Sequence, residues 1–98
     1  MRILVVDDNA GLLAGTQDIL KRHGHSVDIS DSAEAALALV RNTAYDFLLV
    51  DYRMPEHDGL WLLKQVTLPR HTKALLVTSL VDRDVIRSMF DAGACGYI

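Results

Sequence analysis

The stretch YDFLLVDYRMPEHDG, residues 45–59, decides the fold, because it runs from an apolar segment through an aspartate into a loop with proline and glycine. Phe47 to Val50 have the length and composition of a buried strand, and Asp51 lies where that strand ends. The first residues of the chain repeat this order, since Ile3 to Val6 are apolar and two aspartates follow at once. Two strands that end in acidic residues require one common explanation.

Four apolar segments predict strands, and the segments between them have helical spacing. Three of the four do not alternate with polar residues, which indicates strands covered on both faces and hence a parallel sheet. The predicted strands are Ile3 to Val6, Val27 to Ser30, Phe47 to Val50 and Ala74 to Val77. The predicted helices follow the capping residues Asn9, Asp31 (with Glu34 as a capping box), Asp58 and Asp82. This alternation predicts an α/β fold, a doubly wound sheet with right-handed crossovers.

The composition limits the class of protein. A chain of 98 residues predicts a single domain, residues 1–98, and a net charge of −3 with scattered basic residues argues against direct nucleic-acid binding. No apolar run is long enough for a membrane helix and the first seven residues already contain an acid, so we expect a cytoplasmic protein without a signal peptide or membrane contact. Cys95 is expected to be a small buried residue and His57 a solvated one without a role.

The acidic strand ends predict a metal-assisted phosphate site. In a parallel sheet all strands end at one edge, which would hold Asp7, Asp8, Asp51 and Thr78, and the three acids would crowd together if the first and third strands are neighbours. Two carboxylates about 5 Å apart repel each other by roughly 3 kcal/mol at an effective dielectric constant of 20, and Mg²⁺ relieves such repulsion with oxygen ligands. Because Asp51 is expected in the middle of this edge, it is the candidate nucleophile toward phosphorus, with the Thr78 hydroxyl placed to bond a phosphoryl oxygen.

Four segments together resemble the response-regulator receiver domain of two-component signalling. ILVVDDN, DFLLVDYRMPEHDG, LLVTS and DAGACGYI occur in the family's order and with its approximate spacing. The resemblance implies a flavodoxin-like sheet of order 2-1-3-4-5 and phosphorylation of Asp51 by the phosphohistidine of a histidine kinase or phosphotransfer protein. It also implies that Asp8, Asp51 and the Arg53 carbonyl bind Mg²⁺, with Asp7 helping through a water molecule.

The resemblance further implies a switch pair and a longer natural protein. Thr78 and Tyr97 are similar to the family's switch residues, in which a hydroxyl moves to the phosphate and an aromatic ring turns inward behind it. The family's lysine after the fifth strand would fall beyond Ile98, and the family's last helix is lacking. The receiver domain is therefore expected to be C-terminally incomplete, with an output domain possible beyond it. Phe47, Leu49 and Leu76, or their alternates, would then face water, which predicts self-association.

The residues are compatible with three functions. The first is a phosphoacceptor signalling module that is not an enzyme, apart from catalysing its own phosphotransfer and dephosphorylation. The second is a degenerate receiver that acts as a docking domain without phosphate, which the missing lysine favours. The third, a metal-dependent phosphohydrolase, is disfavoured because Arg53 stands where a second acid would be expected after Asp51.

Overall fold

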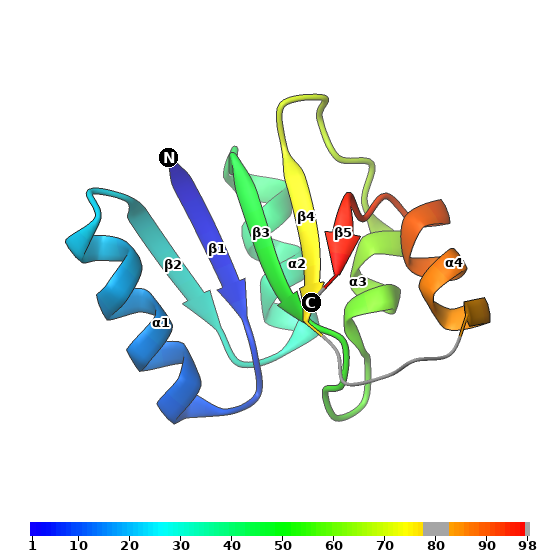
Figure 1. Cartoon of the computed structure of the whole chain (residues 1–98), viewed down its shortest axis with the longest axis horizontal. Coiled ribbons are helices and arrows are strands. Elements are labelled where there is room, and N and C mark those ends of the chain that lie inside the picture. Colours follow the sequence, from blue (N-terminus) through cyan, green and yellow to red (C-terminus); the bar gives the residue numbers. More distant parts are fainter. Residues whose placement is uncertain (78–82, 98) are drawn as a thin grey trace.

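The computed structural model describes residues 1–77 and 83–97, and in these residues strands and helices alternate along the chain (Figure 1). The strands are β1 (Arg2–Val6), β2 (Ser26–Ser30), β3 (Phe47–Asp51), β4 (Lys73–Val77) and β5 (Gly96–Tyr97). The helices are α1 (Ala10–Arg22), α2 (Ala33–Asn42), α3 (Gly59–Gln65) and α4 (Arg83–Asp91). Each of the four predicted strands is present and is one residue longer than predicted.

The strands form one parallel sheet in the order β2-β1-β3-β4-β5. β1 lies between β2 and β3, with Val6 paired to Ser30 on one side and to Val50 on the other. The order 2-1-3-4 confirms the predicted doubly wound, flavodoxin-like fold, and the two residues of β5 pair with Leu75 and Leu76 of β4. Because the strand order reverses between β1 and β3, their C-terminal ends flank the switch point at which such sheets bind ligands.

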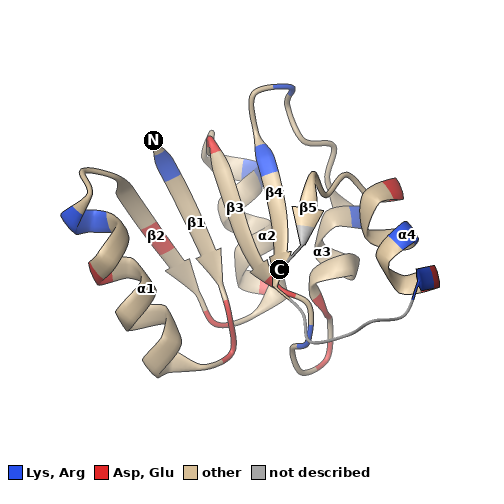
Figure 2. Cartoon of the chain, viewed as in Figure 1, with Lys and Arg blue, Asp and Glu red and all other residues tan. Residues whose placement is uncertain are grey.

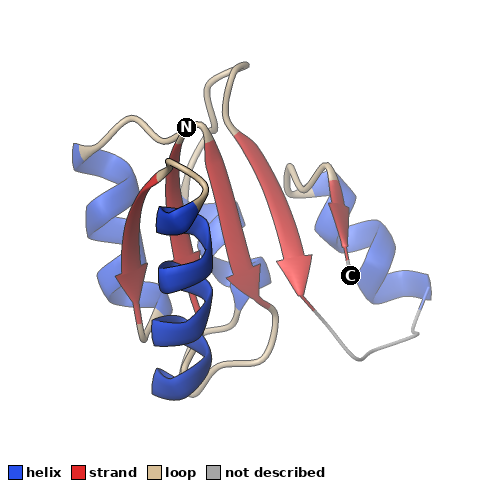
Figure 3. Cartoon of the chain, turned by 60° about the vertical axis from the view of Figure 1, so that its left-hand side comes forward, coloured by secondary structure: helices blue, strands red, loops and turns tan. Residues whose placement is uncertain are grey.

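Helices cover the two faces of this sheet unequally. α1 packs over β1 and β2 on one face, whereas α2, α3 and α4 lie on the other (Figure 3). The larger core lies beneath α2 to α4 and includes the fully buried side chains of Leu4, Leu48 and Leu76. Each such leucine contributes about 1.5–3 kcal/mol to stability relative to an exposed one. The smaller core joins Leu13 of α1 to the inward side chains of β1 and β2.

Capping side chains explain where α1 and α3 begin. Asn9 Oδ1 accepts a hydrogen bond from the N–H of Leu12 at 3.1 Å, and Asp58 Oδ1 accepts one from the N–H of Trp61 at 2.8 Å. Both residues satisfy N–H groups that have no partner within the helix, as the sequence predicts. The predicted cap of α4, Asp82, lies outside the described residues.

The prediction that Asp31 caps α2 is wrong. Ser32 is the capping residue, and its Oγ accepts a hydrogen bond from the N–H of Ala35 at 3.2 Å. Serine and aspartate are both good capping residues. Because the two candidates are adjacent, the sequence predicts the start of the helix only to within one residue. The shift also changes the position of Glu34, whose Oε1 lies 3.6 Å from Nε2 of His57 in the loop before α3.

The expectation of strands covered on both faces is correct for β1 and wrong for β3 and β4. Four consecutive residues of β1 are buried, but buried and half-buried residues alternate in β3 and β4. The reason is the position of α1, which packs over β1 and β2. Leu76 is fully buried against α2 to α4, so its neighbour Leu75 is the half-exposed residue.

Cys95 is exposed, not buried, and it directly precedes β5 at the edge of the sheet, where its backbone N–H donates to the carbonyl of Ala74 at 2.8 Å. Across residues 1–77 and 83–97, no helix combines the length and the apolar character that crossing a membrane requires.

Candidate functional site

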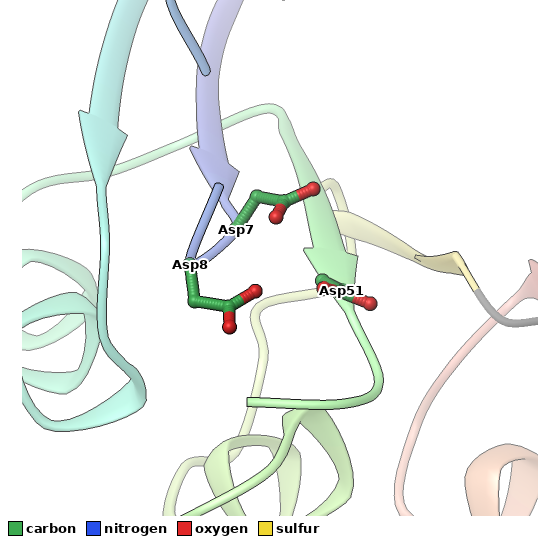
Figure 4. A group of neighbouring side chains, drawn as sticks. All are labelled: Asp7, Asp8 and Asp51. Carbon is green, nitrogen blue, oxygen red and sulfur yellow. The ribbon is translucent and has the colours of Figure 1, made fainter. Parts of the chain in front are cut away.

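Three aspartates meet at the C-terminal edge of the sheet, as Figure 4 shows. Asp7 and Asp8 follow β1, Asp51 ends β3, and one carboxylate oxygen from each lies within 4.8 Å of the others. Asp7 and Asp51 are half-buried, whereas Asp8 is exposed. Figure 2 shows further acidic positions in the loops that follow β2 and β3. The structure therefore brings together the three acids that the sequence analysis placed at this edge.

Two hydrogen bonds hold Asp7 in place. The N–H of Asp7 donates to the carbonyl of Ser30 at 3.1 Å, which continues the pairing of β1 with β2 by one residue. The carboxylate of Asp7 accepts a hydrogen bond from the N–H of Asn9 at 2.9 Å. Because Asn9 in turn caps α1, the acidic pair is attached to the start of that helix.

The electrostatic environment of Asp51 differs from that of a surface acid. Burial is the main cause that raises the pKa of the Asp51 carboxyl from 3.8 to about 6, and the charges of Asp7 and Asp8 also raise it. The N–H of Arg53 donates to Asp51 Oδ1 at 3.3 Å and lowers the pKa in part. A shift of this size is typical of functional sites, where charge is held together against repulsion.

The raised pKa of Asp51 predicts a pH dependence of stability. The Asp51 carboxyl releases its proton near pH 3.8 in the unfolded chain and near pH 6 in the folded chain. The tighter binding of this proton by the folded chain therefore stabilises the fold at about pH 4, and this contribution is lost as the pH rises through 6. In metal-free protein we expect Asp51→Asn to be more stable than wild type by about 1–2 kcal/mol near pH 8 and to match it near pH 4. Urea denaturation at both pH values measures the difference, and a difference independent of pH would contradict the prediction.

Open space lies beside the acidic residues. A hollow of about 390 Å³ adjoins the loop after β3, and a second of about 180 Å³ lies between α1 and the ends of β1, β3 and β4. Asp8 and Arg53 line the first hollow, and Asp7 and Asp51 line the second. A group larger than a metal ion can therefore approach Asp51.

Two predicted site residues cannot be placed. Thr78 and the side chain of Tyr97 lie outside the part of the chain that the structure describes. The backbone of Tyr97 belongs to β5 and pairs with Leu76 of β4. The predicted switch pair is therefore still a prediction.

The structure gives His57 contacts that the sequence analysis did not foresee. Its ring stacks on that of Trp61, with 3.9 Å between ring centroids and 13° between planes, and its Nε2 lies 3.6 Å from Oε1 of Glu34. The expectation that His57 is only solvated is wrong. The signal was the spacing, because a residue just before the helix cap can pack on the first turn of that helix.

The donor atoms of the site fit a hard divalent cation. The three acids offer carboxylate oxygens, which suit Mg²⁺, and one of the three is exposed so that water can complete the coordination. The arrangement also concentrates negative charge that a cation would neutralise. The residues present therefore fit a magnesium ion.

The family follows from comparison with known proteins. The model of the response regulator receiver domain matches residues 3–98. The chain belongs to this family. A gliding motility regulatory protein of Myxococcus xanthus is 34% identical over 101 residues, which cover 100% of this chain and 13% of that protein. The receiver domain thus spans only a small part of this relative.

Solved structures agree with this assignment. A response regulator receiver domain protein of Methanospirillum hungatei JF-1 has a TM-score of 0.88 at 30% identity, covering 99% of this chain and 78% of that one. The receiver domain of the Arabidopsis thaliana histidine kinase CKI1, complexed with Mg²⁺, has a TM-score of 0.85 at 25% identity over 99% and 81% of the two chains. A Burkholderia pseudomallei response regulator with a phosphorylated aspartic acid and a calcium ion has a TM-score of 0.89 at 25% identity, over 98% and 57%. The chain is a receiver domain of two-component signalling.

Proposed function

We propose that this receiver domain accepts a phosphoryl group on Asp51 from the phosphohistidine of a histidine kinase or phosphotransfer protein. The observation that carries the proposal is the position of Asp51, half-buried at the switch point of the sheet, beside two further carboxylates and with its pKa raised to about 6. At neutral pH such a carboxylate is still mostly ionised, and it is more basic than an ordinary aspartate, which favours attack on phosphorus. The phosphorylated aspartic acid of the Burkholderia regulator supports the same chemistry.

Mg²⁺ is the proposed cofactor. Asp8, Asp51 and the carbonyl of Arg53 would hold it, with Asp7 contributing through water, and the Mg²⁺ complex of the Arabidopsis receiver domain supports this choice of ion. The ion would supply positive charge beside the phosphoryl oxygens. The 98 residues themselves provide the nucleophile and its orientation, through the hydrogen bond from the N–H of Arg53.

The proposed transfer changes only two bonds to phosphorus. An Asp51 carboxylate oxygen bonds to phosphorus while the bond from phosphorus to the donor's imidazole nitrogen breaks. That nitrogen keeps the electron pair, and with a proton on the other ring nitrogen the donor leaves as neutral imidazole. In the proposed switch, the Thr78 hydroxyl then bonds a phosphoryl oxygen and the Tyr97 ring turns inward, which alters a partner-binding surface. The chain is not an enzyme in the usual sense, because the group that is modified is its own carboxylate. Water later removes the phosphoryl group from that carboxylate.

Phosphorylation with a small phosphodonor tests this function. Incubation with acetyl phosphate and Mg²⁺ should add one phosphoryl group to wild type, seen by intact-mass analysis, and the bond should be labile to hydroxylamine. Asp51→Asn should stay unmodified, because an amide is not a nucleophile toward phosphorus. Equal modification of both proteins would refute the assignment of Asp51. A folded wild type that is never modified would favour the docking function instead.

We also propose that the chain self-associates through the face of the sheet beside α1. Phe47, Leu49, Leu75 and Val77 are half-exposed there, next to a hollow of about 220 Å³. A second copy related by two-fold symmetry would remove this apolar area from water. Sedimentation equilibrium at micromolar concentration should show a dimer for wild type and a monomer for Leu49→Gln/Leu75→Gln. A monomeric wild type would refute this contact.

The surroundings of the domain are proposals as well. Because residues 1–98 correspond to 13% of the Myxococcus relative, we propose that this receiver domain works with an output domain elsewhere in its protein. We place it in the cytoplasm, where histidine kinases present their phosphohistidine, and we assign it no contact with nucleic acid or membrane.

A further inference from the structure

The loop between β3 and α3 is fixed at its two ends by backbone hydrogen bonds. The N–H of Tyr52 donates to the carbonyl of Val77, and the N–H of Gly59 donates to the carbonyl of Tyr52, both at 2.9 Å. Between these anchors the loop carries Arg53, whose N–H reaches the carboxylate of Asp51. The conformation of this loop therefore decides what surrounds Asp51 on one side.

The tip of the loop adopts a strained turn. The N–H of His57 donates to the carbonyl of Pro55 at 2.8 Å, and Glu56 between them has a φ of 68°. These features define a γ-turn of the rarer kind, with a non-glycine residue in the left-handed region. Such a turn persists only when neighbouring contacts hold it in place.

The side chain of His57 supplies contacts of the required kind. Its ring stacks on Trp61, which lies in the first turn of α3 and packs partly against the larger core. Its Nε2 lies 3.6 Å from the carboxylate of Glu34, in the first turn of α2. One side chain thus joins the strained turn to two helices, and we call these three residues, Glu34, His57 and Trp61, the loop clamp.

We propose that His57 is a positioning residue for the phosphoacceptor site, which it serves by holding the β3–α3 loop so that Arg53 faces Asp51. The proposal rests on the proposed function, because Arg53 is assigned there both to orient Asp51 and to contribute to the Mg²⁺ site. Among the described residues, His57 is joined to Glu34 and Trp61, and neither a hydrogen bond nor an ion pair joins it to Asp51. It acts through the γ-turn, four residues beyond Arg53, and its ring is stacked on Trp61 of α3.

Mg²⁺ affinity is the first readout. We expect His57→Ala to weaken Mg²⁺ binding by about 3- to 10-fold, less than the loss that follows removal of a direct partner of a metal ligand, because His57 acts one contact further away. His57→Phe keeps a ring over Trp61 and should stay within about two-fold of wild type. Glu34→Gln, which removes only the charge, should fall between the two. His71→Ala, at an exposed histidine of another loop, is the matched control and should bind as wild type does.

Trp61 is the single tryptophan of the chain, so its fluorescence reports the clamp directly. Replacing His57 with alanine removes the stacked ring and should change the emission of the folded, metal-free protein, whereas His71→Ala should not. Calorimetry follows the Mg²⁺ titrations of wild type and of every variant.

Amide hydrogen exchange of the metal-free protein separates the two proposals. The N–H groups of Arg53 and residue 57 should exchange about ten-fold faster in His57→Ala than in wild type, with amides of β1 unchanged, because only the loop opens. If exchange is faster in His57→Ala but wild type does not bind Mg²⁺, the loop clamp is supported and the proposed metal function is refuted. Unchanged exchange and unchanged Mg²⁺ affinity in a folded His57→Ala would overturn the positioning role.

Discussion

Millimolar Mg²⁺ should raise the melting temperature of the wild-type chain, and Asp8→Ala should abolish this response. A ligand that binds the folded state alone stabilises it by mass action, by about 1.4 kcal/mol at ten times its dissociation constant. For a chain of this length that corresponds to roughly 6–11 °C. Asp8 is exposed, and one of its carboxylate oxygens lies within 4.8 Å of those of Asp7 and Asp51, so its loss removes a ligand without opening the core.

The metal-free variant provides an internal check. Asp8→Ala relieves repulsion among three carboxylates, so without metal it should be at least as stable as wild type. The control Asp91→Ala removes an exposed acid from the end of α4 and should keep the full Mg²⁺ response. Differential scanning fluorimetry measures these melting temperatures. If Mg²⁺ does not change the melting temperature of wild type, the whole metal site is contradicted.

Replacing Gly59 with alanine should lower the free energy of unfolding by about 1–3 kcal/mol. A Cβ atom at this position would lie 2.6 Å from the backbone oxygen of Asp51 and 2.9 Å from Cδ2 of Leu76. The first contact is with backbone, which cannot rotate away, so β3 or α3 must move. The same movement would displace Asp51, and Mg²⁺ binding should weaken together with stability.

Gly15 in the middle of α1 is the matched control for this substitution. A Cβ atom there meets nothing within 4 Å, so Gly15→Ala should raise stability by up to about 1 kcal/mol through helix propensity. Urea denaturation of the two variants should thus give opposite signs. Equal and small effects at both positions would show that the close approach of α3 to the end of β3 is not rigid.

The sequence was sufficient for the parts of this fold that depend on local pattern. Apolar runs followed by aspartate predicted β1 and β3, and Asn9 and Asp58 predicted the starts of α1 and α3, because each signal lies within a few residues of its effect. The convergence of the three acids needs one further condition, that β1 and β3 are neighbours in the parallel sheet. The family resemblance, not periodicity, supplied the strand order.

Contacts between distant segments could not be predicted in this way. The approach of His57 to Glu34 joins residues 23 positions apart, and the sequence around either residue does not predict it. The exposure of Cys95 and the alternating burial of β4 depend on which helices cover which face. The choice of Ser32 over Asp31 as a cap reflects a balance between two similar side chains, which the whole fold decides.

Locating the phosphoryl group within the chain tests the central claim most directly. Borohydride reduces an aspartyl phosphate to homoserine, and trypsin separates the segment 42–53, which contains Asp51, from the segment 3–21, which contains Asp7 and Asp8. After treatment with acetyl phosphate and Mg²⁺, tandem mass spectrometry should find homoserine at position 51 and unchanged aspartate at positions 7, 8 and 46. Homoserine at any of those other positions, with Asp51 intact, would contradict the account.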